Sequence, residues 1–201
     1  PLRNKGQVWS LDPLQIEPKW QRLWAQERTW EVSNQPAESG PDRFEKSYVL
    51  EMLPYPSGEP HIGHLKNYAL GDAIAHFHRR TGHRVLHPMG YDAFGLPAEN
   101  HAIRTGVHPR QSTNDSIAAF QRAFRSWGIS IDWSRELATH EPSYYRWTQW
   151  IFLKLFDRGL AYRKEAAVKW CPNDQTVLAN EQVIDGRCER CGFEVEVRQL
   201  E

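Results

Sequence analysis

The stretch from Leu50 to His64, LEMLPYPSGEPHIGH, constrains the fold more than any other part of the chain. Tyr48–Leu53 is mostly apolar and rich in strand-forming residues, and it predicts a short buried strand. The prolines and glycine of Pro54–Pro60 exclude regular structure there, so the strand must lead into a tight loop. A helix is predicted from His61 to Arg80, because apolar residues recur every three or four positions: Ile62, Leu65, Ala69, Ala73 and Phe77.

Two histidines lie in the first turn of this predicted helix. His61 and His64 are three positions apart, so their imidazoles project from nearly the same face. A helix N-terminus offers free N–H groups and the positive end of the helix dipole, which favours a phosphate. Gly63 lacks a Cβ and lets a flat group lie on the backbone. An H-x-x-H pair alone also fits a polar surface helix, but the preceding strand and loop favour a nucleotide site.

The words PYPSGEPHIGH resemble the "HIGH" signature of class I aminoacyl-tRNA synthetases, in the form typical of leucyl-tRNA synthetases. The stretches GYDAFGLPAEN, DWSRELAT and EPSYYRWTQW are similar to the same family, and the resemblance runs from about Trp20 to the C-terminus. It implies that His61 and His64 are catalytic residues that contact the phosphates, with Gly63 beneath adenine. It also implies an ATP site formed by Pro54, Tyr55, Pro56, Ser57, Gly58, His61, Ile62, Gly63 and His64.

A second short strand is expected within His83–Pro88, after a helix stop at Thr81-Gly82. Strand, helix and strand make a βαβ unit, which implies a parallel pair with a right-handed crossover. Ligands bind at the carboxyl ends of strands in such sheets. We therefore expect the loops Pro54–His64 and Met89–Asn100 to face one crevice.

Asp92 lies in the second loop between apolar neighbours, and a carboxylate in an apolar pocket needs a cation such as an α-ammonium group. The alternative is that Asp92 caps the next helix. The resemblance implies that Asp92 holds the amino group of leucine and that Met52 and Tyr55 line the amino-acid pocket. Core packing is the alternative for Met52 and Tyr55.

The remaining helices are assigned no chemistry. We expect helices at Glu17–Arg28, with Pro18 in its first turn, and at Ser143–Arg158, whose aromatic residues favour burial over base stacking. Between them we expect a connector at Asn34–Lys46, a turn-rich link at His101–Pro109, and a further helix. That helix is capped by Thr113, Asn114 or Asp115, and an extended segment at Ile129–Glu136 follows it.

The last forty residues change to short strand-like pieces with turns. Cys188 and Cys191 form a C-x-x-C knuckle, and Cys171 precedes Asp174 where a second knuckle would have its second cysteine. A zinc ribbon uses four ligands from two knuckles. Cys171, Asp174, Cys188 and Cys191 are thus candidate ligands of a structural zinc, and a metal-free ribbon is the alternative.

The composition is that of a globular chain: of 201 residues, 40% are hydrophobic and 25% charged. Lys and Arg number 25, as do Asp and Glu, so no global positive field favours nucleic acid. We find no membrane span and no secretory signal. Three cysteines suit a reducing compartment, and we expect the cytoplasm, although an organellar origin stays open because the chain does not begin with Met.

The predicted fold class is α/β: a Rossmann-like parallel-sheet nucleotide-binding half-domain with a small zinc-ribbon-like β appendage. The expected parts are an N-terminal helix and connector (1–46), the first half of the catalytic domain (47–160) and a ribbon-like subdomain (161–201).

The resemblance implies leucine activation with ATP and Mg²⁺, then transfer to tRNA(Leu). A KMSKS-type loop and the editing and anticodon domains are not found. We therefore expect an N-terminal part of a longer synthetase, with little or no activity without its remainder. A non-catalytic nucleotide- or tRNA-binding module is the alternative, and the same chemistry on isoleucine, valine or methionine is a third reading.

Overall fold

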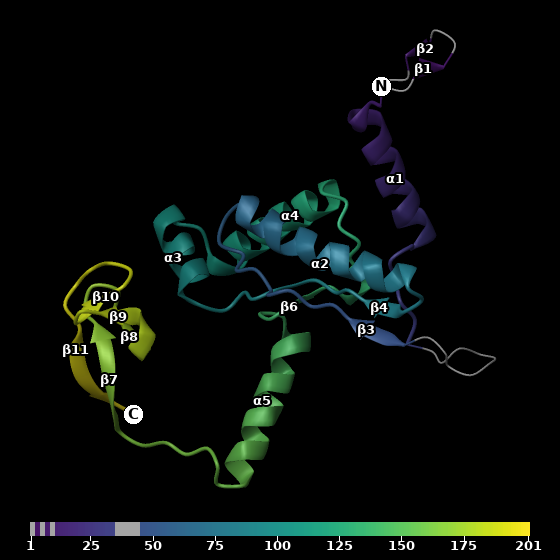
Figure 1. Ribbon diagram of the computed structural model, residues 1–201. Helices are drawn as coiled ribbons and strands as arrows, with labels where there is room; N and C mark the ends of the chain where they lie inside the picture. Colours follow the sequence, from purple (N-terminus) through teal and green to yellow (C-terminus); the bar gives the residue numbers. More distant parts are fainter. Residues whose placement is uncertain (1–2, 5–6, 9–10, 35–44) are drawn as a thin grey trace. The chain divides into compact units, whose positions relative to one another are not determined.

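The computed structural model describes residues 3–4, 7–8, 11–34 and 45–201. The chain divides into two compact units, residues 1–146 and 147–201, which are treated separately here (Figure 1). The expected connector at Asn34–Lys46 falls mostly outside the described residues. No described helix is long and apolar enough to cross a membrane.

The first unit is built on a parallel strand pair joined by a helix. β3 (Lys46–Tyr48) and β4 (Arg84–Leu86) are parallel, with Ser47 opposite Val85, and α2 (Ile62–Arg80) connects them. α2 ends at Thr81, and Gly82 takes the left-handed backbone (φ +90°) that glycine tolerates best. The predicted βαβ order and the parallel pairing are confirmed.

The first strand is shorter and less buried than predicted. β3 ends at Tyr48, and only Val49 extends the pairing, through its N–H to Leu86 O at 2.9 Å. Val49 is buried with Ala75 and Val85, whereas Tyr48 and Leu50 are more than half exposed. Because side chains alternate between the faces of a strand, Tyr48 and Leu50 point away from the helix that covers Val49.

A second crossover follows directly. β5 (Gly90–Tyr91) pairs in parallel with β6 (Leu137–Ala138), after α3 (Leu96–Thr105), α4 (Pro109–Ser126) and the 3₁₀ turn η1 (Trp133–Arg135). The link expected at 101–109 is therefore mostly helix.

The start of α4 also differs from the prediction. Its cap is His108, whose Nδ1 accepts from the Arg110 N–H at 3.2 Å, and not a residue of 113–115. Pro109 at the first helical position supplies a ready-made φ for this earlier start.

The core lies between these strands and one side of two helices, and Figure 1 shows α2 and α4 together on that side. It consists of Tyr68 from α2, Phe120 and Phe124 from α4, and Met89, Tyr91, Ile129 and Ile131 from the strand segments.

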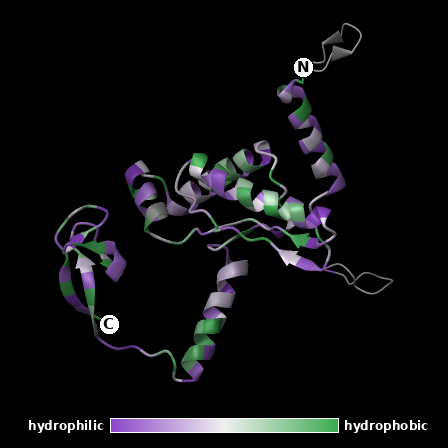
Figure 2. Ribbon diagram, in the orientation of Figure 1, coloured by the Kyte–Doolittle hydropathy of each residue, from purple (hydrophilic) through white to green (hydrophobic). Residues whose placement is uncertain are grey.

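The predicted apolar stripe of α2 is wrong. Ile62 and Phe77 are exposed, and the buried face carries Tyr68, Gly71 and Ala75. Figure 2 shows hydrophobic residues along α2. Leu70 and Ile74 are among those that are exposed. The small residues Gly71 and Ala75 allow close approach to the strands, and the Tyr68 hydroxyl donates to Met52 O, which hydrophobicity alone does not reveal.

α1 (Pro13–Glu27) precedes this core. Asp12 caps it by accepting from the Leu14 N–H at 3.1 Å, so Pro13 and not Pro18 occupies the first turn. Gln21 Nε2 donates to Ser126 O at 3.0 Å and ties α1 to the end of α4. A short hairpin of β1 (Arg3–Asn4) and β2 (Gln7–Val8) lies before α1.

The second unit is antiparallel. β11 (Glu196–Leu200), β7 (Ala166–Cys171) and β8 (Thr176–Leu178) form one sheet in that order. β9 (Val183–Ile184) and β10 (Arg187–Cys188) form a hairpin after the turn η2 (Asn180–Gln182). The predicted change to short strands is confirmed.

α5 (Pro142–Asp157) runs across the boundary between the units. The burial predicted for its aromatic side chains is wrong: none of its residues is buried against the described chain, and Trp150 is 52% exposed.

Candidate functional site

The two predicted histidines build the N-terminal cap of α2. His61 is the N-cap residue, and its Nδ1 accepts from the Gly63 N–H at 3.1 Å. His64 reaches back, and its Nδ1 accepts from the His61 N–H at 3.1 Å. The two rings therefore lie together, with centroids 3.9 Å apart. This reciprocal arrangement is a capping box in which imidazoles take the usual places of hydroxyl and carboxylate groups.

The cap also determines which ring nitrogen carries the proton. A nitrogen that accepts from a backbone N–H has no proton of its own, so both neutral rings must be protonated at Nε2. The Nε2–H groups are therefore the free donors of His61 and His64. Both lie where the first amide N–H groups of α2 and its dipole favour an anion.

The surroundings of His64 keep its ring neutral. His64 packs edge-on against Phe120, with ring centroids 5.0 Å apart. Burial, and secondly the proximity of His61, lowers the pKa of His64. Gly63 leaves room for the His61 ring, because a Cβ at this position would lie 3.0 Å from both Cε1 and Nδ1 of His61.

The loop before α2 is fixed by its backbone. Pro54 and Pro56 are buried, the Ser57 N–H donates to Tyr55 O at 2.9 Å, and Gly58 has φ +143°, a region that essentially only glycine adopts. Ser57 and Gly58 are partly buried, and Ile62 is exposed on the first turn of the helix. The loop thus presents a rigid edge beside the paired histidines.

Asp92 lies directly beside this loop. Its N–H donates to Pro54 O at 3.0 Å, and the following N–H, of Ala93, donates to Thr139 Oγ1 at 2.8 Å. Asp92 does not cap α3, whose N-cap is Gly95. Its half-buried carboxylate makes no hydrogen bond or ion pair within the described chain. The Asp92 carboxylate is therefore an anion without a cationic partner in the described chain.

Met52 and Tyr55 are accessible and not packed in the core. Met52 is 82% exposed and Tyr55 53% exposed. The Tyr68 hydroxyl donates to Met52 O at 2.8 Å, which fixes the backbone while the side chain stays free.

Sequence reasoning missed a buried polar group beneath this loop. His87 is fully buried, and its Nε2 lies 2.9 Å from Glu51 Oε1, while its Nδ1 lies 3.0 Å from Ser130 O. A glutamate within an apolar strand and a histidine at the end of the next strand were the available signals, because neighbouring strands bring such positions together.

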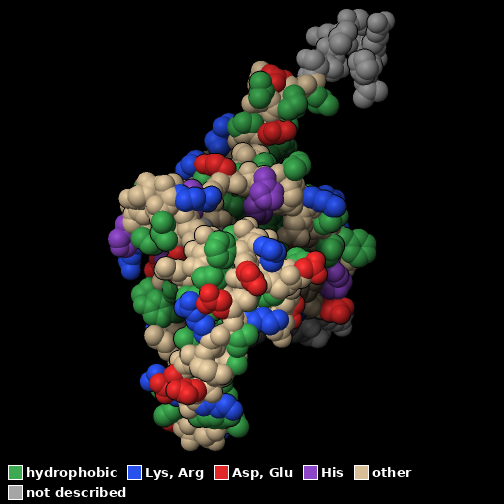
Figure 3. All heavy atoms as spheres, turned by 90° about the vertical axis from the view of Figure 1, so that its left-hand side faces the viewer, with side chains coloured by type: hydrophobic (Ala, Val, Ile, Leu, Met, Phe, Trp, Pro, Cys, Tyr) green, Lys and Arg blue, Asp and Glu red, His purple; other side chains and the backbone are tan. Residues whose placement is uncertain are grey.

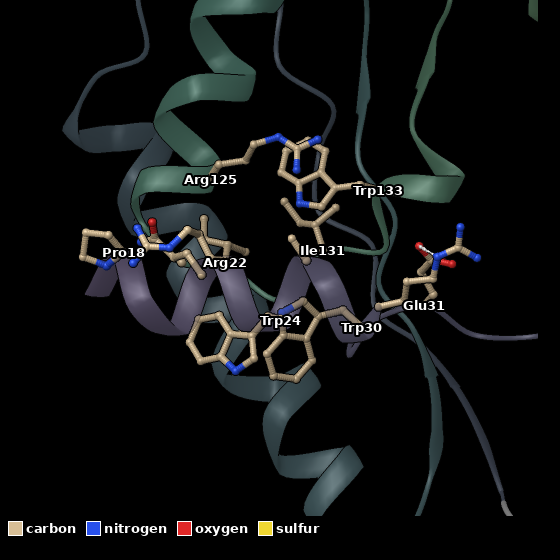
Figure 4. Close-up of a pocket in the computed structure, with 13 residues that line it drawn as sticks. Pro18, Arg22, Trp24, Trp30, Glu31, Arg125, Ile131 and Trp133 are labelled. Atoms are coloured by element: carbon tan, nitrogen blue, oxygen red, sulfur yellow. Dashed lines mark ion pairs between the residues drawn. The ribbon is translucent and has the colours of Figure 1, made fainter. Parts of the chain in front are cut away.

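A cavity of about 400 Å³ lies elsewhere in the first unit, between α1 and the segment around Trp133 (Figure 4). Trp24, Trp30 and Trp133 line it, and the Arg125 guanidinium lies 4.0 Å from the centroid of Trp133. None of the predicted site residues lines this cavity. The candidate site is the junction of loop and helix, not this cavity.

The four predicted metal ligands converge in the second unit. Their ligand atoms all lie within 4.8 Å of one another. Cys171 Sγ is 3.4 Å from Cys191 Sγ, and Cys188 Sγ is 3.4 Å from Asp174 Oδ2. The turns Cys171–Asp174 and Cys188–Cys191 supply two ligands each, and the Asp174 N–H points at Cys171 Sγ.

The family follows from residues 47–199, which match the model described as tRNA synthetases class I (M). The chain belongs to the class I tRNA synthetases. Among class I relatives, the leucine–tRNA ligases of Thermosipho melanesiensis and Thermotoga maritima are 55% and 54% identical, over 94% of this chain and 22% of their own length. The Aquifex aeolicus leucine–tRNA ligase subunit alpha is 51% identical and is covered over 29% of its length.

Solved class I structures agree. The LeuRS–tRNA–LeuAMS ternary complex of Agrobacterium radiobacter K84 superimposes with a TM-score of 0.85 at 43% identity, over 94% of this chain and 23% of that one. A Mycobacterium tuberculosis methionyl-tRNA synthetase, with a TM-score of 0.61 at 22% identity, shares the fold. The predicted resemblance to leucyl-tRNA synthetases is confirmed, and the chain spans about a fifth of the length of these curated relatives.

Proposed function

We propose that this chain supplies the phosphate-binding and ammonium-binding parts of a site that activates leucine with ATP and passes it to tRNA(Leu). The observation that carries the proposal is the imidazole cap of α2, which leaves two Nε2–H donors at the positive end of a helix. The remainder of the synthetase, ATP with Mg²⁺, leucine and tRNA(Leu) are its proposed partners.

The histidines act as preorganised donors. In activation the carboxylate of leucine attacks the α-phosphorus of ATP in line, and pyrophosphate leaves. Negative charge grows on the phosphate oxygens, and the Nε2–H groups of His61 and His64 donate to them without any reorganisation, because the Nδ1 atoms are already held by the backbone. Adenine is proposed to lie beside Gly63, although the space that its missing Cβ leaves is taken by the His61 ring.

Asp92 positions the amino acid. Its carboxylate lacks a partner in the described chain, so an α-ammonium group would complete an ion pair beside Pro54. Met52 and Tyr55 present exposed side chains next to it for the apolar side chain of leucine. The pairing of Asp92 with the α-amino group would orient the carboxylate of leucine toward the phosphates.

The test is ATP–pyrophosphate exchange with leucine, isoleucine, valine and methionine, measured on residues 1–201 and on the natural polypeptide that contains them. We expect leucine-dependent exchange by the natural polypeptide and little or none by residues 1–201 alone. Exchange that prefers another amino acid would correct the substrate. No exchange by either polypeptide, with nucleotide or tRNA binding retained, would favour the non-catalytic module.

We also propose that Cys171, Asp174, Cys188 and Cys191 hold a structural zinc. Three sulfur ligands and one oxygen in a tetrahedron of Zn–S about 2.3 Å would lie roughly 3.5–3.8 Å apart, close to the observed 3.4 Å. Bound zinc would hold the two turns together and contribute folding free energy. We also propose a cytoplasmic location, because zinc-binding cysteines that form no disulfide suit a reducing compartment.

A further inference from the structure

Glu51 and His87 form a buried pair beneath the proposed site. The His87 side chain is 0% exposed and that of Glu51 8%. His87 Nε2 lies 2.9 and 3.1 Å from the two carboxylate oxygens. Glu51 directly precedes Met52, and His87 follows β4, so the pair joins the two segments that lead into the proposed site.

Both ring nitrogens of His87 have hydrogen-bond partners. Ser130 O lies at Nδ1 and is a carbonyl, which only accepts, so Nδ1 carries a proton. Nε2 lies against the carboxyl group of Glu51, and one proton between them satisfies both groups. The pair is thus fully hydrogen-bonded away from water.

α2 is shaped around this pair. A Cβ on Gly71 would overlap the carboxyl group of Glu51. One turn earlier, the Tyr68 hydroxyl donates to Met52 O at 2.8 Å. Glu51 and Met52 therefore both contact one face of α2, the helix whose N-terminus carries His61 and His64.

The other charged groups around His87 have partners of their own. From α2, Asp72 Oδ1 accepts from the Ser130 N–H at 2.8 Å, Arg79 Nη2 donates to Ser130 O at 3.0 Å, and His76 lies 3.7 Å from Asp72. From the segment after α4, the Asp132 N–H donates to His87 O at 2.8 Å. Glu51 is the carboxylate hydrogen-bonded to His87.

We propose that Glu51, held by His87 in the space that Gly71 leaves, is a positioning residue that sets the register of the Met52–Tyr55 segment against α2. Asp92, the proposed ammonium site, is hydrogen-bonded to Pro54 in this segment, whereas His61 and His64, the proposed phosphate site, belong to α2. Glu51 therefore sets the distance between the two sites. The proposal rests on the proposed leucine activation for its kinetic consequence, but its structural part is independent of that reaction.

The test is a double-mutant cycle in the natural polypeptide. Glu51→Ala and Gly71→Ala each displace the segment, and a misplacement of 1 Å lowers activation by about 10²-fold. The double variant is expected to be no slower than Glu51→Ala alone, since removal of the carboxylate frees the space that the new methyl group needs. Additive losses would overturn the proposal, as would exchange by Glu51→Ala within twofold of the wild type.

A conservative variant and a matched control separate positioning from general instability. Glu51→Gln keeps the shape and can hydrogen-bond a neutral His87, so exchange is expected to stay within about fivefold of the wild type. Glu45→Gln is the matched control, because Glu45 and His83 form another glutamate–histidine pair, at 3.3 Å, in which the carboxylate is exposed. This variant should leave the exchange rate unchanged. A loss with Glu51→Gln as large as with Glu51→Ala would contradict the register role.

A second measurement distinguishes failure of this proposal from failure of the proposed function. ¹⁵N-labelled histidine resonances should show His61 and His64 protonated at Nε2 only, because their Nδ1 atoms accept from backbone N–H groups. Glu51→Ala should shift the His61 and His64 signals even if the wild type performs no leucine-dependent exchange. Unchanged His61 and His64 signals in Glu51→Ala would overturn the proposal by themselves.

Discussion

Gly63 illustrates how a missing methyl group serves chemistry at the scale of one residue. The His61 ring occupies the space that a Cβ would fill, with two ring atoms only 3.0 Å from it. Alanine would keep the helix but push the imidazole away from the Gly63 N–H that orients it. Activity should therefore respond more strongly than stability.

We expect Gly63→Ala to lower leucine-dependent exchange about tenfold, because the Nε2–H donor moves by a fraction of an ångström. The free energy of unfolding should change by less than about 1 kcal/mol, because the helix propensity of alanine offsets the weakened cap hydrogen bond. Exchange kinetics and urea denaturation measure the two effects. Lys66→Ala, at an exposed position on the same helix, is the control, and a variant as active as wild type would show that the His61 ring tolerates the shift.

Residue roles were predicted from the sequence where a motif was complete. The words PYPSGEPHIGH and GYDAFGLPAEN placed the histidines and Asp92 at one junction, and Asp92 indeed lies beside Pro54. The roles of these residues in catalysis stay predictions. Glu51 and His87 could not be paired from sequence, because their contact depends on the register of two strands and on the space above Gly71.

At the scale of the element, ends were easier to predict than faces. Pro60 before α2 and Thr81-Gly82 after it fixed its limits to within one residue. The buried face was predicted wrongly, because hydrophobicity favours Phe77 whereas packing uses Tyr68, Gly71 and Ala75. Pro18 and Thr113 misled in the same way: each is a good local signal that an earlier Pro–cap pair overrode.

The corrected face of α2 can be tested by stability. Phe77→Ala should change the free energy of unfolding of residues 1–201 by less than about 0.5 kcal/mol, since the ring is exposed. Phe124→Ala removes a fully buried ring and should cost about 3–5 kcal/mol. Urea denaturation followed by circular dichroism measures the free energy of unfolding of both variants. Equal losses would show that Phe77 is buried as the sequence predicted.

At the scale of the whole molecule, the two units use different means of stabilisation. The first has a cluster of large apolar side chains between helices and strands. The second has a cluster of Cys171, Leu178 and Cys188, too small to order some fifty residues by apolar burial alone. The formal net charge is zero, and Figure 3 shows acidic and basic side chains interspersed on one face.

Metal removal should therefore affect the second unit selectively. We expect one zinc per chain by elemental analysis. Chelation should move the NMR resonances of residues 147–201 to random-coil chemical shifts, while the chemical shifts of residues 45–146 stay unchanged. Asp174→Cys should tighten binding by completing four thiolates, and Asp174→Ala should weaken it at least about tenfold. Glu189→Ala, beside Cys188 but outside the cluster, is the control. A zinc-free wild type with an ordered second unit would establish the metal-free ribbon.

The capped histidines have one further consequence, for the kind of bond they can form. The unprotonated nitrogen of a neutral imidazole is its nucleophile, and in His61 and His64 that atom is Nδ1, already engaged by a backbone N–H. Its lone pair is directed at the protein's own main chain and away from the open junction. Neither ring can therefore attack phosphorus and carry a phosphoryl group through a covalent intermediate. In the proposed activation, the adenylate would therefore form in a single displacement between the two substrates, with no covalent bond to either histidine.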